Sequence, residues 1–309
     1  MTPLVCIAGP TASGKSAIAL ELADLLPGEI VSVDSMQVYR GLNIGSAKPS
    51  AIDQARIPHH LIDVVEISES FDAAEFIHHA TAACASIRTR GRTPILCGGT
   101  GFYFEAFFHG LSEMPASDAP LRALLESTPL GTLLEELAGR DPVAYERIDR
   151  HNPRRVIRAI EVIRLTGKPF SSFRRDWNPE SLVCATREDR VQFVIDRHPF
   201  ALVDRIHERI DSMFQQGLVE ETRALLGKGL KSNRTAMQAI GYRQVVDFLE
   251  GSSTLAASME EIRARTRQFA KRQRSWFRTR RDWQPFQVPS GESPTESASR
   301  IYDLVRRGS

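Results

Sequence analysis

The chain has 309 residues, enough for one large domain or for two of moderate size. Hydrophobic residues make up 42% of it and charged residues 25%, which is typical of soluble globular proteins and excludes a disordered or fibrous chain. The 40 basic and 38 acidic residues give a net charge of +2, so the total charge by itself favours neither a nucleic-acid binder nor a protein with an acidic partner.

The first half of the chain alternates between short apolar runs and helical periodicities. The periodicities predict helices at 14–26 and at 72–88, the second capped by Asp72. The apolar runs predict strands at 4–8, 29–33, 60–65 and 93–97. Strands separated by helices indicate a mostly parallel sheet with helices on both faces, and ligands of such α/β sheets bind beyond the carboxyl ends of the strands.

The pattern divides the chain into four parts. Residues 1–115 form the first part of an α/β core, and 116–187 show only helical periodicity and are predicted to be an all-helical insertion. Residues 188–285 return to the core with a strand at 190–196 and end in basic helices, while 286–309 are predicted to be a loosely ordered tail. No apolar run is long enough for a membrane span and no secretory leader is recognisable, so we expect a cytoplasmic protein without a membrane partner.

The strongest motif follows the first predicted strand. It fits G-x-x-x-x-G-K-[ST] and consists of Gly9, Pro10, Thr11, Ala12, Ser13, Gly14, Lys15 and Ser16. Its backbone N–H groups and the following helix N-terminus are expected to hold a di- or triphosphate, with Lys15 on the phosphate oxygens and Ser16 as a ligand of Mg²⁺. With the parallel sheet, the motif predicts a P-loop NTPase-like core.

An ordinary P-loop NTPase also needs an acid at the end of a neighbouring strand. The strand at 93–97 ends instead in Gly98, Gly99 and Thr100, which offer no carboxylate. Asp34 ends the strand at 29–33 and is the strand-terminal acid nearest to the P-loop in the sequence. From residue type alone Asp34 is equally a turn cap, but its place at the active end of a strand favours a functional role.

Several further motifs follow one another in a fixed order. Together with the P-loop they resemble the tRNA dimethylallyltransferases, also called tRNA isopentenyltransferases, in their bacterial form. The resemblance runs from about residue 4 to about residue 281 and is carried by residues 34–49, 58–63, 98–103, 155–162, 239–243 and 266–273.

The resemblance implies a reaction. The P-loop would hold dimethylallyl diphosphate rather than ATP, and the dimethylallyl group would pass to N6 of the adenosine 3′ of the tRNA anticodon. Asp34 would then be the general base toward the adenine amine. Thr100 would lie beside the reacting groups, and Arg209 with Lys15 would bind the diphosphate.

The resemblance also implies an RNA-binding set, because the target adenine must be flipped out of the anticodon loop. It includes Asp34, Ser35, Met36 and Gln37 around the base, with Thr100. The remaining positions are Arg122, Arg154, Arg155, Val156, Ile157, Arg158, Gln238, Gly241, Arg243, Arg267, Lys271 and Arg272.

The charge distribution supports an RNA partner independently. Residues 263–281 carry nine basic residues, no acid and three aromatic side chains, which is typical of a surface for a phosphate backbone and unstacked bases. Residues 150–175 carry eight basic residues and one acid, Glu161. Without these two segments the chain has 23 basic and 37 acidic residues, so an acidic body carries two basic surfaces.

Mg²⁺ is the only metal we predict. The adjacent pairs His59-His60 and His78-His79 lack the spacing of metal ligands on a helix, and the four cysteines form neither a zinc set nor a disulfide framework. We therefore expect a monomeric transferase of tRNA. Two alternatives are a P-loop kinase of a small molecule, using ATP, and a non-enzymatic RNA-binding module with a vestigial P-loop.

Overall fold

The computed structural model describes residues 2–111, 114–173 and 190–307. The chain forms two compact units, one of residues 1–108 with 182–309 and the other of residues 109–181. Each unit has its own buried core. They are described separately below.

The larger unit is built on a parallel sheet of six strands in the order β3-β2-β4-β1-β5-β6. The strands are β1 (Leu4–Ala8), β2 (Gly28–Val33), β3 (His59–His60), β4 (Thr93–Gly98), β5 (Arg190–Asp196) and β6 (Gln284–Gln287). The predicted fold class, an α/β P-loop-like core with a parallel sheet, is confirmed.

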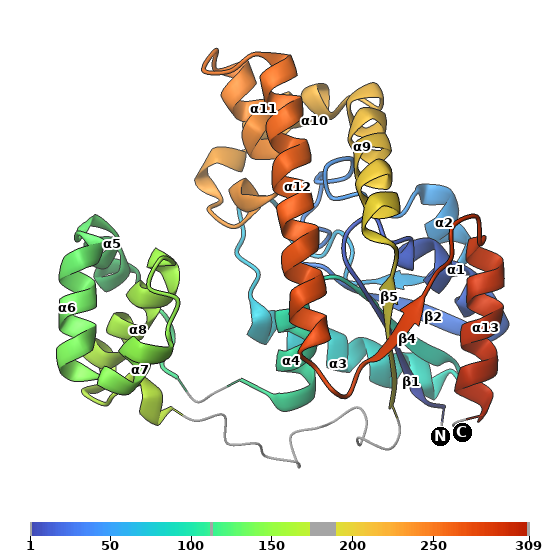
Figure 1. Cartoon of the computed structure of the whole chain (residues 1–309), viewed down its shortest axis with the longest axis horizontal. Helices are drawn as coiled ribbons and strands as arrows, with labels where there is room; N and C mark the ends of the chain where they lie inside the picture. The colour runs from blue at the N-terminus through green and yellow to red at the C-terminus, as the bar shows by residue number, and fades with distance from the viewer. Residues whose placement is uncertain (1, 112–113, 174–189, 308–309) are drawn as a thin grey trace. The chain divides into compact units, whose positions relative to one another are not determined.

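Helices cover both faces of this sheet (Figure 1). Along β1, Leu4, Cys6 and Ala8 point to one face, while the alternate residues Val5 and Ile7 point to the other. The first face packs against α3 (Ala73–Thr89), α4 (Gly101–His109), α9 (Pro199–Gln215) and α12 (Leu255–Arg278), and the second against α1 (Lys15–Leu25) and α13 (Pro294–Arg307). All five residues of β1 are buried, as expected for a central parallel strand.

The remaining helices of this unit are short. They are α2 (Ala51–Arg56), α10 (Leu218–Leu226) and α11 (Tyr242–Leu249). The predicted cap of α3 is confirmed, since the Asp72 carboxylate accepts from the N–H groups of Ala74 and Glu75. Among the helices of the described ranges, none has the length and apolar character needed to cross a membrane.

The strand predicted at 60–65 is wrong in extent. Only His59 and His60 pair with β2, and the chain then turns away because Leu61 and Asp63 adopt positive φ angles of 62° and 54°. The Asp63 carboxylate accepts from the Lys48 ammonium at 2.6 Å. Leu61 packs into the core, with Val64 and Val65 against it, and Val65 forms only an isolated bridge with Tyr39, so these residues do not extend the sheet.

The smaller unit is a helical bundle in its described residues. It consists of α5 (Ala119–Ser127), α6 (Leu130–Arg140), α7 (Pro142–Arg147) and α8 (Pro153–Thr166) around a core that includes Leu133, Leu137 and Ile160. The predicted insertion at 116–187 extends into residues 174–189, which lie outside the described ranges, as do Arg174, Arg175 and Cys184. The other three cysteines are buried thiols.

The prediction of a loosely ordered tail at 286–309 is wrong. Residues 284–287 form β6 at the edge of the sheet, and α13 packs against α1. Ile301 and Val305 of α13 are 0% and 2% exposed. The sequence prediction failed here because residues 289–299 are rich in Ser, Pro, Glu and Gly, which is typical of a linker. In the structure they lead into the start of α13, where Ser293 and Glu296 bond to each other.

We expect Ile301→Ala to lower the free energy of unfolding by about 3 kcal/mol, because it removes a fully buried side chain between α13 and α1. Leu304→Ala is the matched control in the same helix; Leu304 is 42% exposed, so its loss should cost less than about 1 kcal/mol. Urea denaturation of the full chain measures both. Equal effects for the two variants would contradict the packed position of α13.

Candidate functional site

A cleft of about 450 Å³ opens at the carboxyl ends of the strands. Its walls come from the P-loop, the segment after β2, the turn after β4, and helices α9 and α12. It therefore brings together Thr11, Lys15, Ser16, Asp34, Ser35, Met36, Gln37, Thr100, Arg209, Gln238 and Arg272 of the residues predicted from the sequence. The position is the one expected for a ligand of a parallel α/β sheet.

The P-loop connects β1 to α1 by a left-handed turn. Ala12 and Gly14 have positive φ angles of 62° and 91°, and Gly14 is the residue that precedes α1. The Lys15 ammonium folds over the loop and donates to the carbonyl of Pro10 at 3.2 Å. The Lys15 ammonium is thus bonded to the backbone of its own loop. A phosphate group of a ligand would take the place of the Pro10 carbonyl as its partner.

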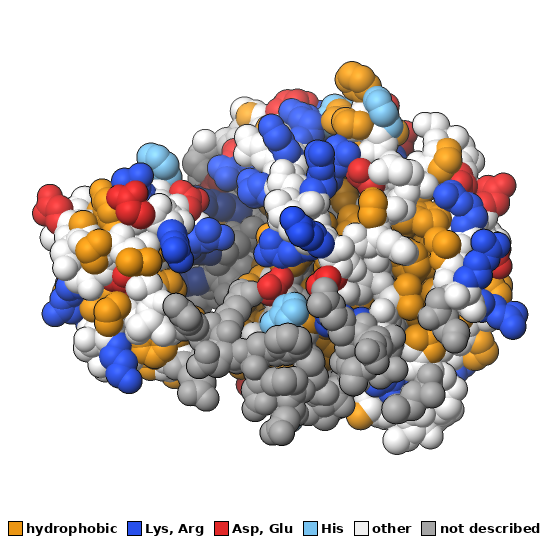
Figure 2. All heavy atoms as spheres, turned by 60° about the horizontal axis from the view of Figure 1, so that its bottom comes forward, with side chains coloured by type: hydrophobic (Ala, Val, Ile, Leu, Met, Phe, Trp, Pro, Cys, Tyr) orange, Lys and Arg blue, Asp and Glu red, His pale blue; other side chains and the backbone are white. Residues whose placement is uncertain are grey.

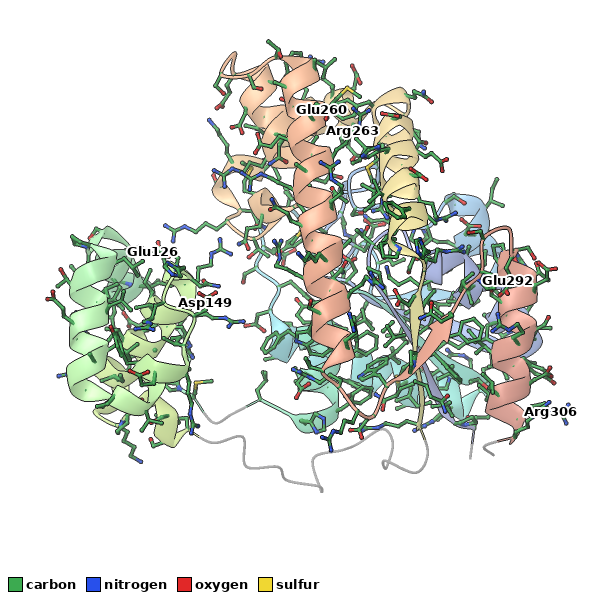
Figure 3. All side chains as sticks on the ribbon, viewed as in Figure 1. Glu126, Asp149, Glu260, Arg263, Glu292 and Arg306 are labelled. Carbon is green, nitrogen blue, oxygen red and sulfur yellow. The ribbon has the colours of Figure 1, made fainter. Side chains whose placement is uncertain are left out.

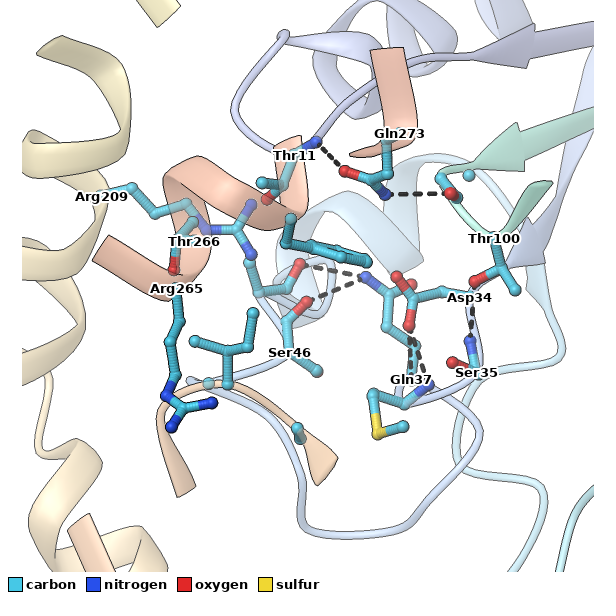
Figure 4. Close-up of a pocket in the computed structure, with 18 of the residues that line it drawn as sticks. Thr11, Asp34, Ser35, Gln37, Ser46, Thr100, Arg209, Arg265, Thr266 and Gln273 are labelled. Atoms are coloured by element: carbon cyan, nitrogen blue, oxygen red, sulfur yellow. Dashed lines mark hydrogen bonds between the residues drawn. The ribbon is translucent and has the colours of Figure 1, made fainter. Parts of the chain in front are cut away.

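Three charged side chains share the cleft. Burial lowers the pKa of the Lys15 ammonium, and the nearby Asp34 carboxylate opposes that shift. Burial likewise lowers the pKa of the Arg209 guanidinium, and Asp34 again acts in the opposite direction. Figure 4 shows Arg209 extending from α9 toward Thr11. Two desolvated cations beside one carboxylate leave net positive charge, which favours binding of an anion.

Asp34 caps a turn, as one of the two interpretations of the sequence predicts, and it also lines the cleft. Its Oδ1 atom caps the following turn by accepting from the N–H groups of Met36 at 2.8 Å and Gln37 at 3.3 Å. In the part of the chain that the structure describes, no donor is bonded to Oδ2. Thr100 lies on the opposite side of the segment and accepts from the N–H of Ser35 through Oγ1 at 3.3 Å (Figure 4). One carboxylate oxygen is therefore fixed and the other is available for chemistry.

The amide of Gln37 is used within the protein. Its Oε1 accepts from Ser32 Oγ at 2.8 Å, and its Nε2 donates to the carbonyls of Ser46 and Ala47. The loop that carries these carbonyls is held in turn by Tyr242, whose hydroxyl accepts from the N–H of Gly45 at 3.1 Å. Gln37 therefore shapes the cleft by fixing this loop.

Sequence reasoning missed Gln273. This side chain of α12 is 8% exposed and connects the two loops of the cleft: Oε1 accepts from the N–H of Thr11 at 2.8 Å, and Nε2 donates to the carbonyl of Gly99 at 2.9 Å (Figure 4). It also leaves no room at Gly99, where an added Cβ would lie 2.3 Å from Nε2. Its one sequence signal was its place in the motif at 266–273.

We expect Gln273→Leu to lower the free energy of unfolding by about 2 kcal/mol or more, because the Thr11 N–H and the Gly99 carbonyl lose their buried partner. Gln268→Leu is the matched control on the same helix, where the side chain is exposed, and should change stability by less than about 0.5 kcal/mol. Urea denaturation followed by circular dichroism compares the two. A Gln273 variant as stable as the control would show that the bridge is dispensable.

The basic helix α12 is partly neutralised. Arg263 pairs with Glu260, both labelled in Figure 3, and with Asp211. Arg265 pairs with Glu261 at 2.6 Å. Further acidic partners are Asp196 for Arg274 and Glu105 for Arg280. Arg267 contacts His207 Nε2 at 2.9 Å. Among the described residues, no carboxylate pairs with the remaining basic residues of the segment, which are Lys271, Arg272, Arg278 and Arg281.

The unpaired charges give α12 a basic outer surface. Figure 2 shows Lys and Arg side chains gathered over the middle of the larger unit, along this helix. The Arg272 guanidinium lies 5.8 Å from the ring centre of the exposed Phe269, and both side chains line the cleft. A cation and an aromatic ring at the mouth of a cleft suit a phosphate and an unstacked base.

In the smaller unit, a buried carboxylate organises two of the predicted RNA-binding arginines. Glu161 is 0% exposed and accepts from Ser117 Oγ at 2.5 Å, from the N–H of Asp118 at 3.1 Å and from Arg158 at 2.7 Å. Arg122 approaches it at 3.5 Å. Although burial opposes ionisation, the hydrogen bonds from Ser117 and Arg158 hold the pKa of Glu161 below its ordinary value.

Three of the predicted RNA-binding residues are buried. Val156 and Ile157 are 0% and 7% exposed and lie in the core of the helical bundle, so their side chains offer no surface to RNA. Gly241 is buried with φ 108°, and its N–H donates to Gln244 Oε1 as the cap of α11. The neighbouring Arg154, Arg155, Gln238 and Arg243 are exposed. On α8, helical periodicity alone could have separated the buried Val156 and Ile157 from the exposed Arg154 and Arg155.

We expect Glu161→Gln to destabilise the protein by about 2 kcal/mol at neutral pH, since Arg158 loses its charged partner. Because the pKa of Glu161 is lowered by folding, its stabilisation is complete above the ordinary carboxyl range and disappears as the pH falls through the lowered pKa. The difference between wild type and variant should therefore be constant above about pH 6 and shrink below about pH 5.

The measurement is urea denaturation of both proteins across this pH range. Glu135→Gln, at an exposed position of α6, is the control and should show no pH-dependent difference from wild type. A Glu161 difference that grows on acidification would contradict the assignment.

Both histidines of the pair His59-His60 have partners within the protein. His60 Nε2 contacts Glu29 Oε2 at 2.7 Å, and His59 Nδ1 contacts the carbonyl of Ile57 at 2.7 Å. Within the described ranges, no group of three or more His, Cys, Asp or Glu side chains is arranged to hold a metal ion.

The parallel sheet, the loop between β1 and α1 and the cleft above them define the class: a P-loop NTPase-like α/β protein. The family model of the IPP transferases matches residues 37–280. The tRNA dimethylallyltransferase 1 of Trichlorobacter lovleyi is 43% identical over 303 residues, which cover 97% of this chain and 98% of that protein. This chain belongs to the IPP transferase family.

Solved structures agree with this assignment. The tRNA isopentenylpyrophosphate transferase of Bacillus halodurans is 36% identical, with a TM-score of 0.70 over 100% of this chain and 98% of that one. A eukaryotic dimethylallyltransferase acting on tRNA is 26% identical, with a TM-score of 0.82 over 99% of this chain and 80% of that one.

Proposed function

We propose that this protein is a tRNA dimethylallyltransferase. It transfers the dimethylallyl group of dimethylallyl diphosphate to N6 of the adenosine at tRNA position 37 and releases diphosphate. The observation that carries the proposal is the single cleft in which a phosphate-binding loop, two desolvated cations and a carboxylate meet below a basic, aromatic-bearing helix. Its family membership agrees with this reaction.

Asp34 is the general base. The exocyclic amine attacks the allylic carbon of the dimethylallyl group, so that the C–N bond forms as the C–O bond to diphosphate breaks. The proton of the amine passes to Asp34 Oδ2, while Oδ1 remains bonded to the N–H groups of Met36 and Gln37. Because Thr100 fixes the N–H of Ser35, the segment that carries the base is held on both sides.

The diphosphate occupies the P-loop. Lys15 leaves the carbonyl of Pro10 for the phosphate oxygens, and Arg209 approaches from α9. Both cations are desolvated, so they stabilise the charge that develops on the leaving group more strongly than exposed cations would. The Ser16 hydroxyl lines the same cleft and suits Mg²⁺, which usually binds through few protein oxygens and the substrate's own phosphates. Bound there, Mg²⁺ would neutralise charge on the diphosphate.

The anticodon stem-loop is the partner of the basic surface. Position 37 must leave the base stack to reach Asp34, and Arg272 with Phe269 lies at the mouth of the cleft it would enter. Arg267 and Lys271 lie on the same basic helix, and Arg154 and Arg155 are exposed on α8. We propose further that the protein works as a monomer in the cytoplasm, where its tRNA substrate is present.

A kinase is not favoured. The strand β4 ends in Gly98 without the carboxylate that ordinary P-loop NTPases carry at a neighbouring strand end. A kinase would also leave the basic helix without a role. A non-enzymatic RNA-binding protein would not need Asp34 with one oxygen fixed and one available beside a closed P-loop.

Asp34→Asn should lower kcat of prenyl transfer by about 10²- to 10⁴-fold, because the amide keeps the cap on Met36 but cannot accept the proton. Transfer of labelled dimethylallyl diphosphate to unmodified tRNA measures this. Binding of tRNA should change by less than about threefold, which separates a chemical defect from a binding defect.

Lys15→Met is the companion variant and should raise KM for dimethylallyl diphosphate as well as lower kcat. Full transfer by the Asp34 variant would remove the general-base role. Consumption of ATP by the wild type, with no label on RNA, would overturn the proposed function itself.

A further inference from the structure

Two arginines outside the cleft hold the outer side of the P-loop. Arg197 follows β5 and is 8% exposed; its Nε donates to the carbonyl of Ser13 at 2.7 Å. Arg205 lies on α9, and its Nε donates to the carbonyl of Ala12 at 2.9 Å. Both are far from the P-loop in sequence, and neither belongs to any motif that the sequence presents.

These bonds fix two peptide planes. In a trans peptide the C=O and the following N–H point in opposite directions, and the described residues contain no cis peptide. Because Arg197 and Arg205 draw the carbonyls of Ser13 and Ala12 outward, the N–H groups of Gly14 and Ser13 point toward the inner side of the loop. There the N–H of Ser13 makes a long bond of 3.3 Å to Pro10, one that a phosphate oxygen can replace.

The two guanidinium groups also concentrate positive charge at the start of α1. A methyl group added at Gly14 would lie 3.3 Å from Nη2 of Arg197 and 3.7 Å from Nη2 of Arg205. Burial lowers the pKa of Arg197, and the charge of Arg205 lowers it further. Glu292 lies close enough to oppose this shift but is itself bonded to Arg300 at 2.7 Å. In the described ranges no carboxylate forms an ion pair with Arg197 or Arg205.

Helix α9 thus supplies one arginine to the P-loop backbone and another to the cleft. Arg205 and Arg209 are four residues apart and share one face of the helix, with Arg209 lining the cleft and Arg205 on the outer carbonyl of Ala12. We infer that Arg197 and Arg205 are positioning residues of the diphosphate site. They orient the N–H groups of the P-loop, and their unpaired charges are balanced when the anion binds. The inference rests on the proposed function only in naming diphosphate as that anion.

Arg205→Met tests it at a position whose side chain is exposed, so the fold should tolerate the change. We expect the Kd for inorganic pyrophosphate and KM for dimethylallyl diphosphate to rise about tenfold, because an orienting bond and a nearby charge are both lost. The affinity for tRNA should stay within about twofold. Arg197→Met should have an effect at least as large, and Arg205→Lys, which restores the charge, should recover part of the affinity.

Isothermal titration with pyrophosphate reads this out without any transfer reaction, so it remains decisive if the chain transfers no prenyl group. Arg306→Met on α13 is the control and should bind pyrophosphate as the wild type does. Wild-type pyrophosphate affinity in the Arg205 variant would overturn the inference. So would an equal loss of pyrophosphate and tRNA affinity, which would indicate general damage to the protein.

Discussion

The site depends on one constraint, the close approach of backbones at the carboxyl edge of the sheet. The ends of β2 and β4 lie so near each other that a Cβ at Gly98 would sit 2.0 Å from the carbonyl of Val33. Only glycine fits there, and the turn that follows places Gly99 and Thr100 against the P-loop and against Ser35. Parallel strands make this edge a meeting point, and small residues allow the loops to close around a ligand.

Side chains from distant parts of the chain hold the P-loop. Its Ala12 has a positive φ, which costs free energy for a residue with a side chain, and several of its polar groups need partners from elsewhere. Gln273 of α12 supplies one, while Arg197, just after β5, and Arg205 of α9 supply two. The helix that carries the basic surface therefore also supports the P-loop, so the basic surface and the P-loop share one structural element.

Charge has two uses in this molecule. Some arginines of the basic segments are neutralised and hold the structure, such as Arg158 on Glu161 and Arg263 on Glu260 and Asp211. Others have no carboxylate partner among the described residues, such as Lys271 and Arg272. A count of charges along the sequence cannot separate these groups, because pairing depends on which acids the fold brings near. The paired residues orient the surface, and the unpaired ones leave it attractive to a phosphate backbone.

The sequence by itself determined the α/β class, the P-loop, Asp34 at a strand end and the ordered motifs of the family, because these depend on local periodicity, on glycine placement and on residues close together in the chain. The predictions of a strand at 60–65 and of a loosely ordered tail were wrong. The positive φ angles of Leu61 and Asp63 and the packing of Ile301 on α1 depend on contacts with residues distant in the sequence. Only the tertiary structure showed that Val156 and Ile157 are core residues and that the Gln37 amide bonds to the carbonyls of Ser46 and Ala47. It also showed that Gln273, Arg197 and Arg205 support the P-loop. Each of those contacts joins side chains to backbone groups across the fold, and no local pattern records which backbone group a distant side chain will reach.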